Sequence, residues 1–283
     1  MMRIFMTDLK QGLCSGRFLV SCAILLALML SAQGVPSGYD IPNYSIFMTI
    51  FKTNSSLWEQ EYFFSSFHMW EKGITVNHFG AFLPAIAALP SLPLLCDEYK
   101  SQNYRFHCIR SSRLSYILSK GFAVMGVACC AVFFSLSVFG LICAMVFPPL
   151  TSYQTLAIVL ESGLDVSIPW LIILQYTLFL MAFSACGAML CMLFAAMTMD
   201  KFSSLTLPVV ICFLFNQLSQ KLYVREHDIR FYFLSPDQQY RPFQWLPQLF
   251  PDCSVWLILL LPLAGILLFL LSAIFIIQRR LHQ

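Results

Sequence analysis

Charged residues are scarce in this chain, and their scarcity decides its broad class. Only 11% of its 283 residues are Asp, Glu, Lys or Arg, whereas 59% are hydrophobic. A soluble globular domain usually has about 25% charged residues, because its surface must stay hydrated. The composition therefore excludes a soluble globular protein and indicates that lipid is the solvent for most of the surface. The net charge of +3 is also too small to indicate a nucleic acid as partner.

The sequence also lacks the motifs of several classes of enzyme. It has no H-E-x-x-H pair and no G-x-x-x-x-G-K-[ST] loop, so it does not cradle ATP phosphates by that mechanism. The apolar blocks contain no firmly central charge, which argues against a proton relay. Most of the eleven cysteines lie within those blocks, and no pair has metal-ligand spacing. We expect no catalytic residue, no metal site and no directly bound cofactor.

Long apolar blocks are what the sequence has instead. A helix needs about 20 apolar residues to cross about 30 Å of hydrocarbon, and it satisfies its own backbone hydrogen bonds in lipid. The fifth block is the weakest, because it contains Pro208 and ends in Asn216 and Gln217. We expect an all-α integral membrane protein, a single transmembrane domain over residues 1–283. Its six predicted transmembrane helices lie near residues 14–33, 79–95, 121–147, 170–197, 202–218 and 255–277.

The first block has a second interpretation, a cleaved signal peptide, because basic residues precede it and Ser31 and Ala32 follow it. Leu30 makes a poor cleavage pattern, so we favour a retained span. The distribution of charge then predicts the orientation. With six spans, one side carries eleven basic and four acidic residues and the other six basic and ten acidic. Basic residues concentrate in cytoplasmic segments, which predicts that both termini are cytoplasmic.

Residues 1–16, before the first span, predict an amphipathic interface helix. Three basic residues at helical spacing form one face, and an apolar stripe forms another. Such a helix would lie along the inner leaflet with its apolar face down in the lipid and its basic face near anionic lipid. An ordinary basic flank that fixes orientation is the alternative. The basic residues are Arg3, Lys10 and Arg17, and the apolar ones are Phe5, Leu9 and Leu13.

The inner loop over residues 96–120 is the second polar feature of interest. It opens with an acidic pair, and a basic stretch with interspersed aromatic residues follows. Aromatic anchors among arginines suit a protein interface, although a solvated loop that only holds the orientation is the simpler reading. The candidate docking residues are Asp97, Glu98, Tyr99, Arg105, Phe106, Arg110 and Arg113.

The order of these features resembles the permease subunit of bacterial type-2 ATP-binding-cassette exporters. The specific part covers residues 89–123, with its acidic residues and Tyr, its Arg-Ser-Ser-Arg and its Tyr-Ile-Leu-Ser-Lys run. The resemblance implies that the interface helix and the 96–120 loop contact a separate ATPase subunit, which holds ATP and Mg²⁺. It also implies a second permease subunit, alike or different, and location in the bacterial inner membrane. The implied cargo is a peptide, a drug or a lipid-like molecule. A non-transporting membrane protein, such as a sensor or assembly factor, is the alternative.

Overall fold

The computed structural model describes residues 2–33, 45–52, 65–75, 79–101, 112–149, 169–226 and 260–281. Within these ranges the chain forms ten helices and no strand, only an isolated antiparallel bridge between Gln33 and Ser45. The first six helices are α1 (Met2–Leu13), α2 (Gly16–Ser31), α3 (Ile46–Lys52), α5 (Ser66–Thr75), α6 (Phe79–Ala88) and α7 (Leu92–Lys100). The other four are α9 (Arg113–Val146), α11 (Pro169–Thr198), α12 (Lys201–Glu226) and α16 (Leu260–Leu281).

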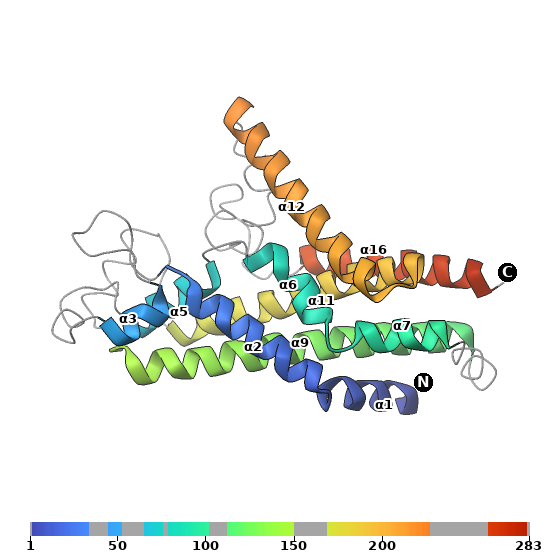
Figure 1. Cartoon of the computed structure of the whole chain (residues 1–283), viewed down its shortest axis with the longest axis horizontal. Coiled ribbons are helices and arrows are strands. Elements are labelled where there is room, and N and C mark those ends of the chain that lie inside the picture. The colour runs from blue at the N-terminus through green and yellow to red at the C-terminus, as the bar shows by residue number, and fades with distance from the viewer. Residues whose placement is uncertain are drawn as a thin grey trace.

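Helices α9 and α11 form the centre of the molecule (Figure 1). Helix α9 packs against α1, α2, α5 and α6, and α11 packs against α6, α12 and α16 as well as α9. The stretches Leu114–Val146 and Ile173–Thr198 of these two helices are long and apolar enough to cross a membrane. The described residues are thus all-helical, as the composition predicts, and they include two helices that can span a bilayer.

The N-terminal segment forms two helices where the sequence predicts an interface helix and a span. Ser15 ends the first and begins the second: its hydroxyl donates to the Gly12 carbonyl at 2.7 Å and accepts from the Phe18 amide at 3.3 Å. Such a capping residue satisfies a donor that a helix start otherwise leaves unpaired. The axes of Ile4–Leu13 and Gly16–Ser31 meet at 56°, and taken together the bent pair is a third candidate span.

The second predicted span, residues 79–95, is divided between α6 and α7. Pro90 lies in the turn between them, and its ring cannot donate the hydrogen bond that a continuous helix requires. Helix α7 then continues to Lys100, so part of the predicted 96–120 loop is helical. Helix α6 packs closely on α11 because residue 187 is glycine: a Cβ there would lie 2.5 Å from the Pro84 Cβ.

The fifth and sixth predicted spans correspond to α12 and α16. Met199 turns the chain between α11 and α12 with a φ of 55°, in the left-handed region that L-residues seldom adopt. Helix α12 leans away from the other helices (Figure 1), whereas α16 packs on α11. Their apolar stretches Lys201–Leu214 and Pro262–Ile277 are shorter than the two helices that can span a bilayer.

Candidate functional site

Lys120, near the start of α9, is a buried cation that connects three helices. Its side chain is only 7% exposed. The Nζ atom lies 2.7 Å from Asp8 Oδ1 of α1 and 2.6 Å from Glu98 Oε1 of α7. Both distances are typical of strong charge-assisted hydrogen bonds. One ammonium group therefore holds α1 and α7 against the helix that crosses the centre of the molecule.

Tyr116 lies one helical turn before Lys120 and hydrogen-bonds to the second carboxylate oxygen of Glu98. Its hydroxyl donates to Glu98 Oε2 at 2.8 Å, so both oxygens of this carboxylate accept a hydrogen bond from α9. The Tyr116 ring also lies under the Lys120 ammonium, with 5.6 Å from Nζ to the ring centroid, within the range of cation–π attraction. The pair is spaced i, i+4 on one face of α9, and it fixes the rotation of α7 about its axis.

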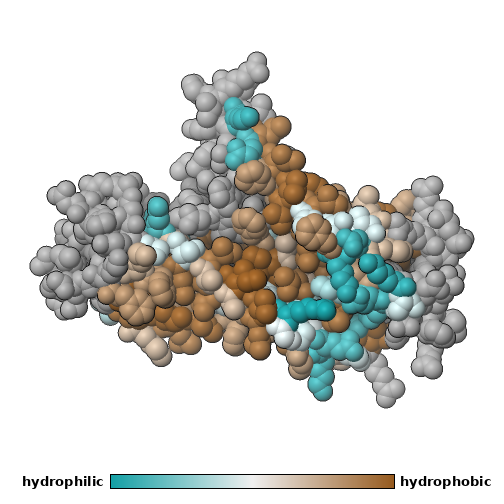
Figure 2. Space-filling view, in the orientation of Figure 1, coloured by the Kyte–Doolittle hydropathy of each residue, from teal (hydrophilic) through white to brown (hydrophobic). Residues whose placement is uncertain are grey.

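Two more ion pairs join α7 to the start of α12. Lys201 Nζ is 2.5 Å from Asp97 Oδ1, and Lys100 Nζ is 3.7 Å from Asp200 Oδ1. These side chains are 41 to 56% exposed, so water screens both pairs. Together with Asp8, Glu98, Tyr116 and Lys120 they make up what we call the charged cluster. Figure 2 shows hydrophilic side chains gathered at this end of the molecule, beside a largely hydrophobic surface.

Asp200 has a second role in this cluster, as the cap of α12. Its Oδ2 accepts from the Ser203 amide at 2.9 Å and from the Ser203 hydroxyl at 3.0 Å. These bonds, with a smaller contribution from Lys100, lower the pKa of Asp200 below its ordinary value. The carboxylate is therefore ionised at neutral pH, where it stabilises the amide end of the helix.

The cluster is suited to holding helices together rather than to catalysis. Asp8 and Glu98 form ion pairs with Lys120, Asp97 forms one with Lys201, and Asp200 forms one with Lys100. A general acid or base must be free to exchange a proton with a reactant, whereas each of these carboxylates faces a cation. Across the described ranges no three His, Cys, Asp or Glu side chains group closely enough to hold a metal ion.

The structure brings together only part of the predicted docking set. Asp97 and Glu98 lie on α7 and face α12 and α9 within the molecule. Tyr99 and Arg113 lie within α7 and α9, but their side chains are outside the description, and the predicted anchors Arg105, Phe106 and Arg110 fall wholly outside the described residues.

The predicted interface helix differs from expectation in what it contacts. Lys10 and Arg17 are exposed, on α1 and α2, while Arg3 lies in the first turn of α1 and its side chain is not described. The apolar stripe of α1 is partly buried against α9: a Cβ at Gly126 would lie 3.1 Å from Leu9 Cδ1. The apolar face of α1 therefore contacts protein, at least in part, where the sequence predicted lipid.

Three residues of the cluster are absent from the predicted set: Asp8, Tyr116 and Lys120. Asp8 is the only acidic residue in an otherwise basic N-terminal segment, and Lys120 is the last cation before a long apolar block. Ionisable residues at such positions usually find a partner, since an unpaired charge near hydrocarbon is costly. That signal could have marked the three residues as candidates, although it does not identify which groups pair.

Comparisons of the chain with protein-family models, with curated proteins and with solved structures gave no match. The composition and the two long apolar helices accordingly define the class of protein, a helical membrane protein. Within the described ranges, its charged cluster joins α1, α7, α9 and the start of α12.

Proposed function

We propose that this chain is the permease subunit of an ATP-driven exporter of the type-2 ATP-binding-cassette class. It crosses the bacterial inner membrane six times with both termini in the cytoplasm. It pairs with a second permease subunit and moves a peptide, drug or lipid-like substrate. A separate ATPase subunit binds ATP and Mg²⁺ and docks on the 96–120 segment and on α1.

The arrangement of the polar ends supports this topology. The start of α1, the end of α7, the start of α9 and the end of α16 lie at one end of the molecule (Figure 1). The charged cluster lies toward the same end (Figure 2). By the predicted topology the segments on that side carry eleven basic and four acidic residues, and such an excess marks the cytoplasmic side of a membrane protein.

The link through Lys120 is the observation that carries the proposal. An ATPase that pushes on α1 or on α7 must move a helix that spans the membrane. Lys120 belongs to α9 and bonds to one carboxylate on each of the two pushed elements, at 2.7 and 2.6 Å. A buried cation that forms two ion pairs resists separation of the helices that it joins, because separating them leaves a buried charge unpaired. Force on either element would therefore reach α9.

Co-purification tests the docking step. The chain is tagged, co-expressed with each ABC-type ATPase that a neighbouring gene encodes, and isolated in detergent. We expect the ATPase to co-purify, and the triple variant Arg105→Ala, Phe106→Ala, Arg110→Ala to lower its recovery at least tenfold. The matched control changes two arginines and a phenylalanine on the predicted outer side, Arg225→Ala, Arg230→Ala and Phe231→Ala, and should bind the ATPase normally.

The variant Glu98→Gln tests transmission separately from docking. It keeps an acceptor for Tyr116 but removes the charge that faces Lys120. We expect normal recovery of the ATPase and an ATP hydrolysis rate that returns to that of the isolated ATPase. Failure of the wild-type chain to bind the ATPase, or equal loss in the triple variant and its control, would overturn the proposal in favour of a non-transporting membrane protein.

A further inference from the structure

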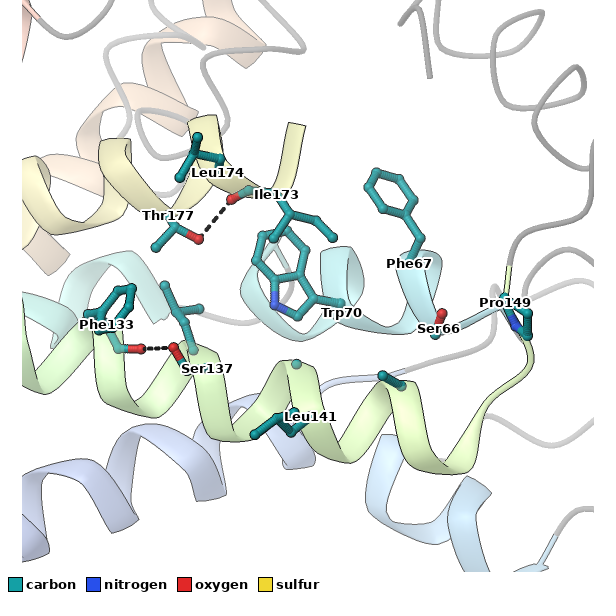
Figure 3. A pocket seen from close by; sticks show the side chains of 13 residues that line it. Ser66, Phe67, Trp70, Phe133, Ser137, Leu141, Pro149, Ile173, Leu174 and Thr177 are labelled. Atoms are coloured by element: carbon teal, nitrogen blue, oxygen red, sulfur yellow. Dashed lines mark hydrogen bonds between the residues drawn. The ribbon is translucent and has the colours of Figure 1, made fainter. Parts of the chain in front are cut away.

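A large cavity lies at the end of α9 that is remote from the charged cluster. It has a volume of about 980 Å³ and opens between α5, the last turns of α9 and the first turns of α11. This volume is at the upper end of the range of about 300–1,000 Å³ found for small-molecule sites. Figure 3 shows Trp70 and Phe67 from α5 on one side and the side chains of α9 and α11 facing them.

The described walls of the cavity are neutral. None of the described residues that line it is Asp, Glu, Lys, Arg or His. Two of the lining hydroxyls already donate within their own helices, Ser137 to the Phe133 carbonyl at 2.8 Å and Thr177 to the Ile173 carbonyl at 2.7 Å. A charged ligand would lose its hydration here without gaining a counter-ion, which costs several kcal/mol. The lining therefore selects an uncharged, mainly apolar occupant.

Trp70 supplies a directional donor to the lining of this cavity, its indole N–H. Its side chain is 3% exposed and packs edge-on against Tyr176, with 6.1 Å between ring centroids. The indole nitrogen faces the cavity between α9 and α11 (Figure 3), where no described group accepts its proton. A buried indole N–H usually has a hydrogen-bond partner. The occupant should therefore carry a neutral acceptor, such as a carbonyl oxygen.

The depth of the cavity identifies the source of such a ligand. Gly140 lines the cavity and lies twenty residues after Lys120 on α9, which is about 30 Å along a helix axis. That length equals the thickness of the hydrocarbon layer. If the charged cluster lies at one membrane surface, Trp70 lies near the other, at the level where lipid ester carbonyls and tryptophan rings meet.

We propose that this cavity binds one acyl chain of an ester lipid, with the ester carbonyl accepting a hydrogen bond from the Trp70 indole N–H. The chain lies along α9 and α11, against Leu141 and Leu174. This inference does not depend on the proposed exporter function, because a membrane protein without transport activity would present the same walls. An acyl chain in this position would fill space between the two helices that can span the bilayer.

Photo-crosslinking on the purified full-length chain tests the proposal. One arm uses a phosphatidylcholine with a diazirine on one acyl chain, and the second uses a diazirine-bearing fatty acid methyl ester. After irradiation, mass spectrometry locates the adducts. We expect adducts on α5, α9 and α11 around the cavity, saturating at low mole fraction of probe and displaced by the unlabelled ester. Labelling by the phospholipid alone, or by both probes, assigns the chain to membrane lipid, and labelling by the methyl ester alone assigns it to a free acyl ester.

Three variants make the test specific. Ala144→Trp fills the cavity and should lower its labelling at least tenfold, whereas Met145→Trp, at the next residue, where the side chain is 83% exposed, should leave it unchanged. Trp70→Phe keeps a ring but removes the donor, and should weaken saturable labelling about three- to tenfold. Should Ala144→Trp fail to fold, Gly140→Ala is the smaller change, since its Cβ would lie at an ordinary 3.5 Å from the Trp70 ring. It should lower labelling to a lesser extent.

Several outcomes would overturn the proposal. One is labelling of the cavity that never saturates and only matches that of the exposed Leu267 and Leu268 on α16. Another is equal labelling in the chain, in Trp70→Phe and in the cavity-filling variants. A third is loss of labelling as the chain dimerises, which would make the cavity part of a contact between two copies.

Discussion

The two ends of α9 are held to their neighbours by opposite kinds of interaction. At Lys120 the contacts are few, ionic and directional, and one cation holds two other helices. Around Phe139 the neighbours are α2 and α5, and the contacts come from close packing of apolar groups. An ionic contact fails abruptly when one partner is removed, whereas an apolar contact weakens with the area or volume that is lost. The ion pairs at Lys120 therefore hold this end of α9 in a defined direction relative to α1 and α7. The apolar packing around Phe139 holds the other end in place without fixing a direction.

The largest effect is expected from removing the buried cation. Lys120→Met keeps the length of the side chain but removes the cation that Asp8 Oδ1 and Glu98 Oε1 both contact. Breaking a buried ion pair in this way costs about 3 to 5 kcal/mol. The melting temperature of the purified protein in detergent, followed by size-exclusion chromatography, should fall sharply.

The matched control for this change is Lys100→Met. Lys100 pairs with Asp200 at 3.7 Å, and both side chains are about half exposed, so water screens the pair and its loss should lower the melting temperature far less. Equal destabilisation by the two variants would mean that the buried position of Lys120 adds nothing. The triple variant Lys120→Met, Asp8→Leu, Glu98→Leu should recover part of the loss, because it also removes the two carboxylates that contact Lys120.

At the other end of α9, the sharpest change is Gly73→Ala. The new Cβ would lie 2.4 Å from the Phe139 ring, which is fully buried, and 3.4 Å from the Met29 carbonyl oxygen. Overpacking of this kind costs about 1 to 3 kcal/mol. Gly16→Ala is the control, since nothing lies within 4 Å of its Cβ position. Comparable melting temperatures for the two variants would contradict the close approach of α5 to α9.

A smaller effect, and one that depends on pH, is expected from His68 on α5. Burial, together with the nearby Lys72, lowers the pKa of His68 to about 3 from an ordinary value of 6.5. The folded protein thus keeps this histidine neutral, while the unfolded chain takes up a proton as the pH falls below 6.5. The contribution of His68 to stability is complete above pH 6.5 and should decrease by about 2 kcal/mol at pH 5.

Melting temperatures of the chain and of His68→Met between pH 7.5 and 5 check this expectation. The variant should have the flatter pH profile, and the control His282→Met should retain the steeper one. Parallel profiles for the chain and for His68→Met would mean that other groups cause the acid sensitivity.

The two ends also differ in how far the sequence predicted them. Hydropathy indicated long apolar helices where α9 and α11 lie, because length and composition determine whether a helix can cross lipid. The same reasoning could not tell at which of its prolines the second block is divided, and it missed the helical continuation through Asp97 and Glu98. Prolines occur in transmembrane helices without always breaking them, so composition alone could not place the turn.

The candidate site was predictable only in part. The acidic pair Asp97 and Glu98 stood out, but their partners are 104 and 22 residues away in the sequence. Which cation meets which carboxylate depends on how the helices pack, and no local pattern encodes it. The Trp70 cavity was equally hidden, since its walls come from three segments that read separately as apolar. Local periodicity predicts an element, whereas a site depends on the contacts between elements.

Helix α7 begins after the turn at Pro90, and near its other end Glu98 is bonded to Lys120 of α9. Glu98 lies six residues beyond Leu92, or about 9 Å along the axis, so a rotation of about 10° at the turn would move its carboxylate by about 1.5 Å. That displacement alone can carry the 2.6 Å contact with Lys120 to the limit of about 4 Å at which an ion pair is counted. The ion pair with α9 therefore tolerates a rotation of α7 of no more than about 10°, so the angle of this short helix decides whether α9 and α7 stay joined through Lys120.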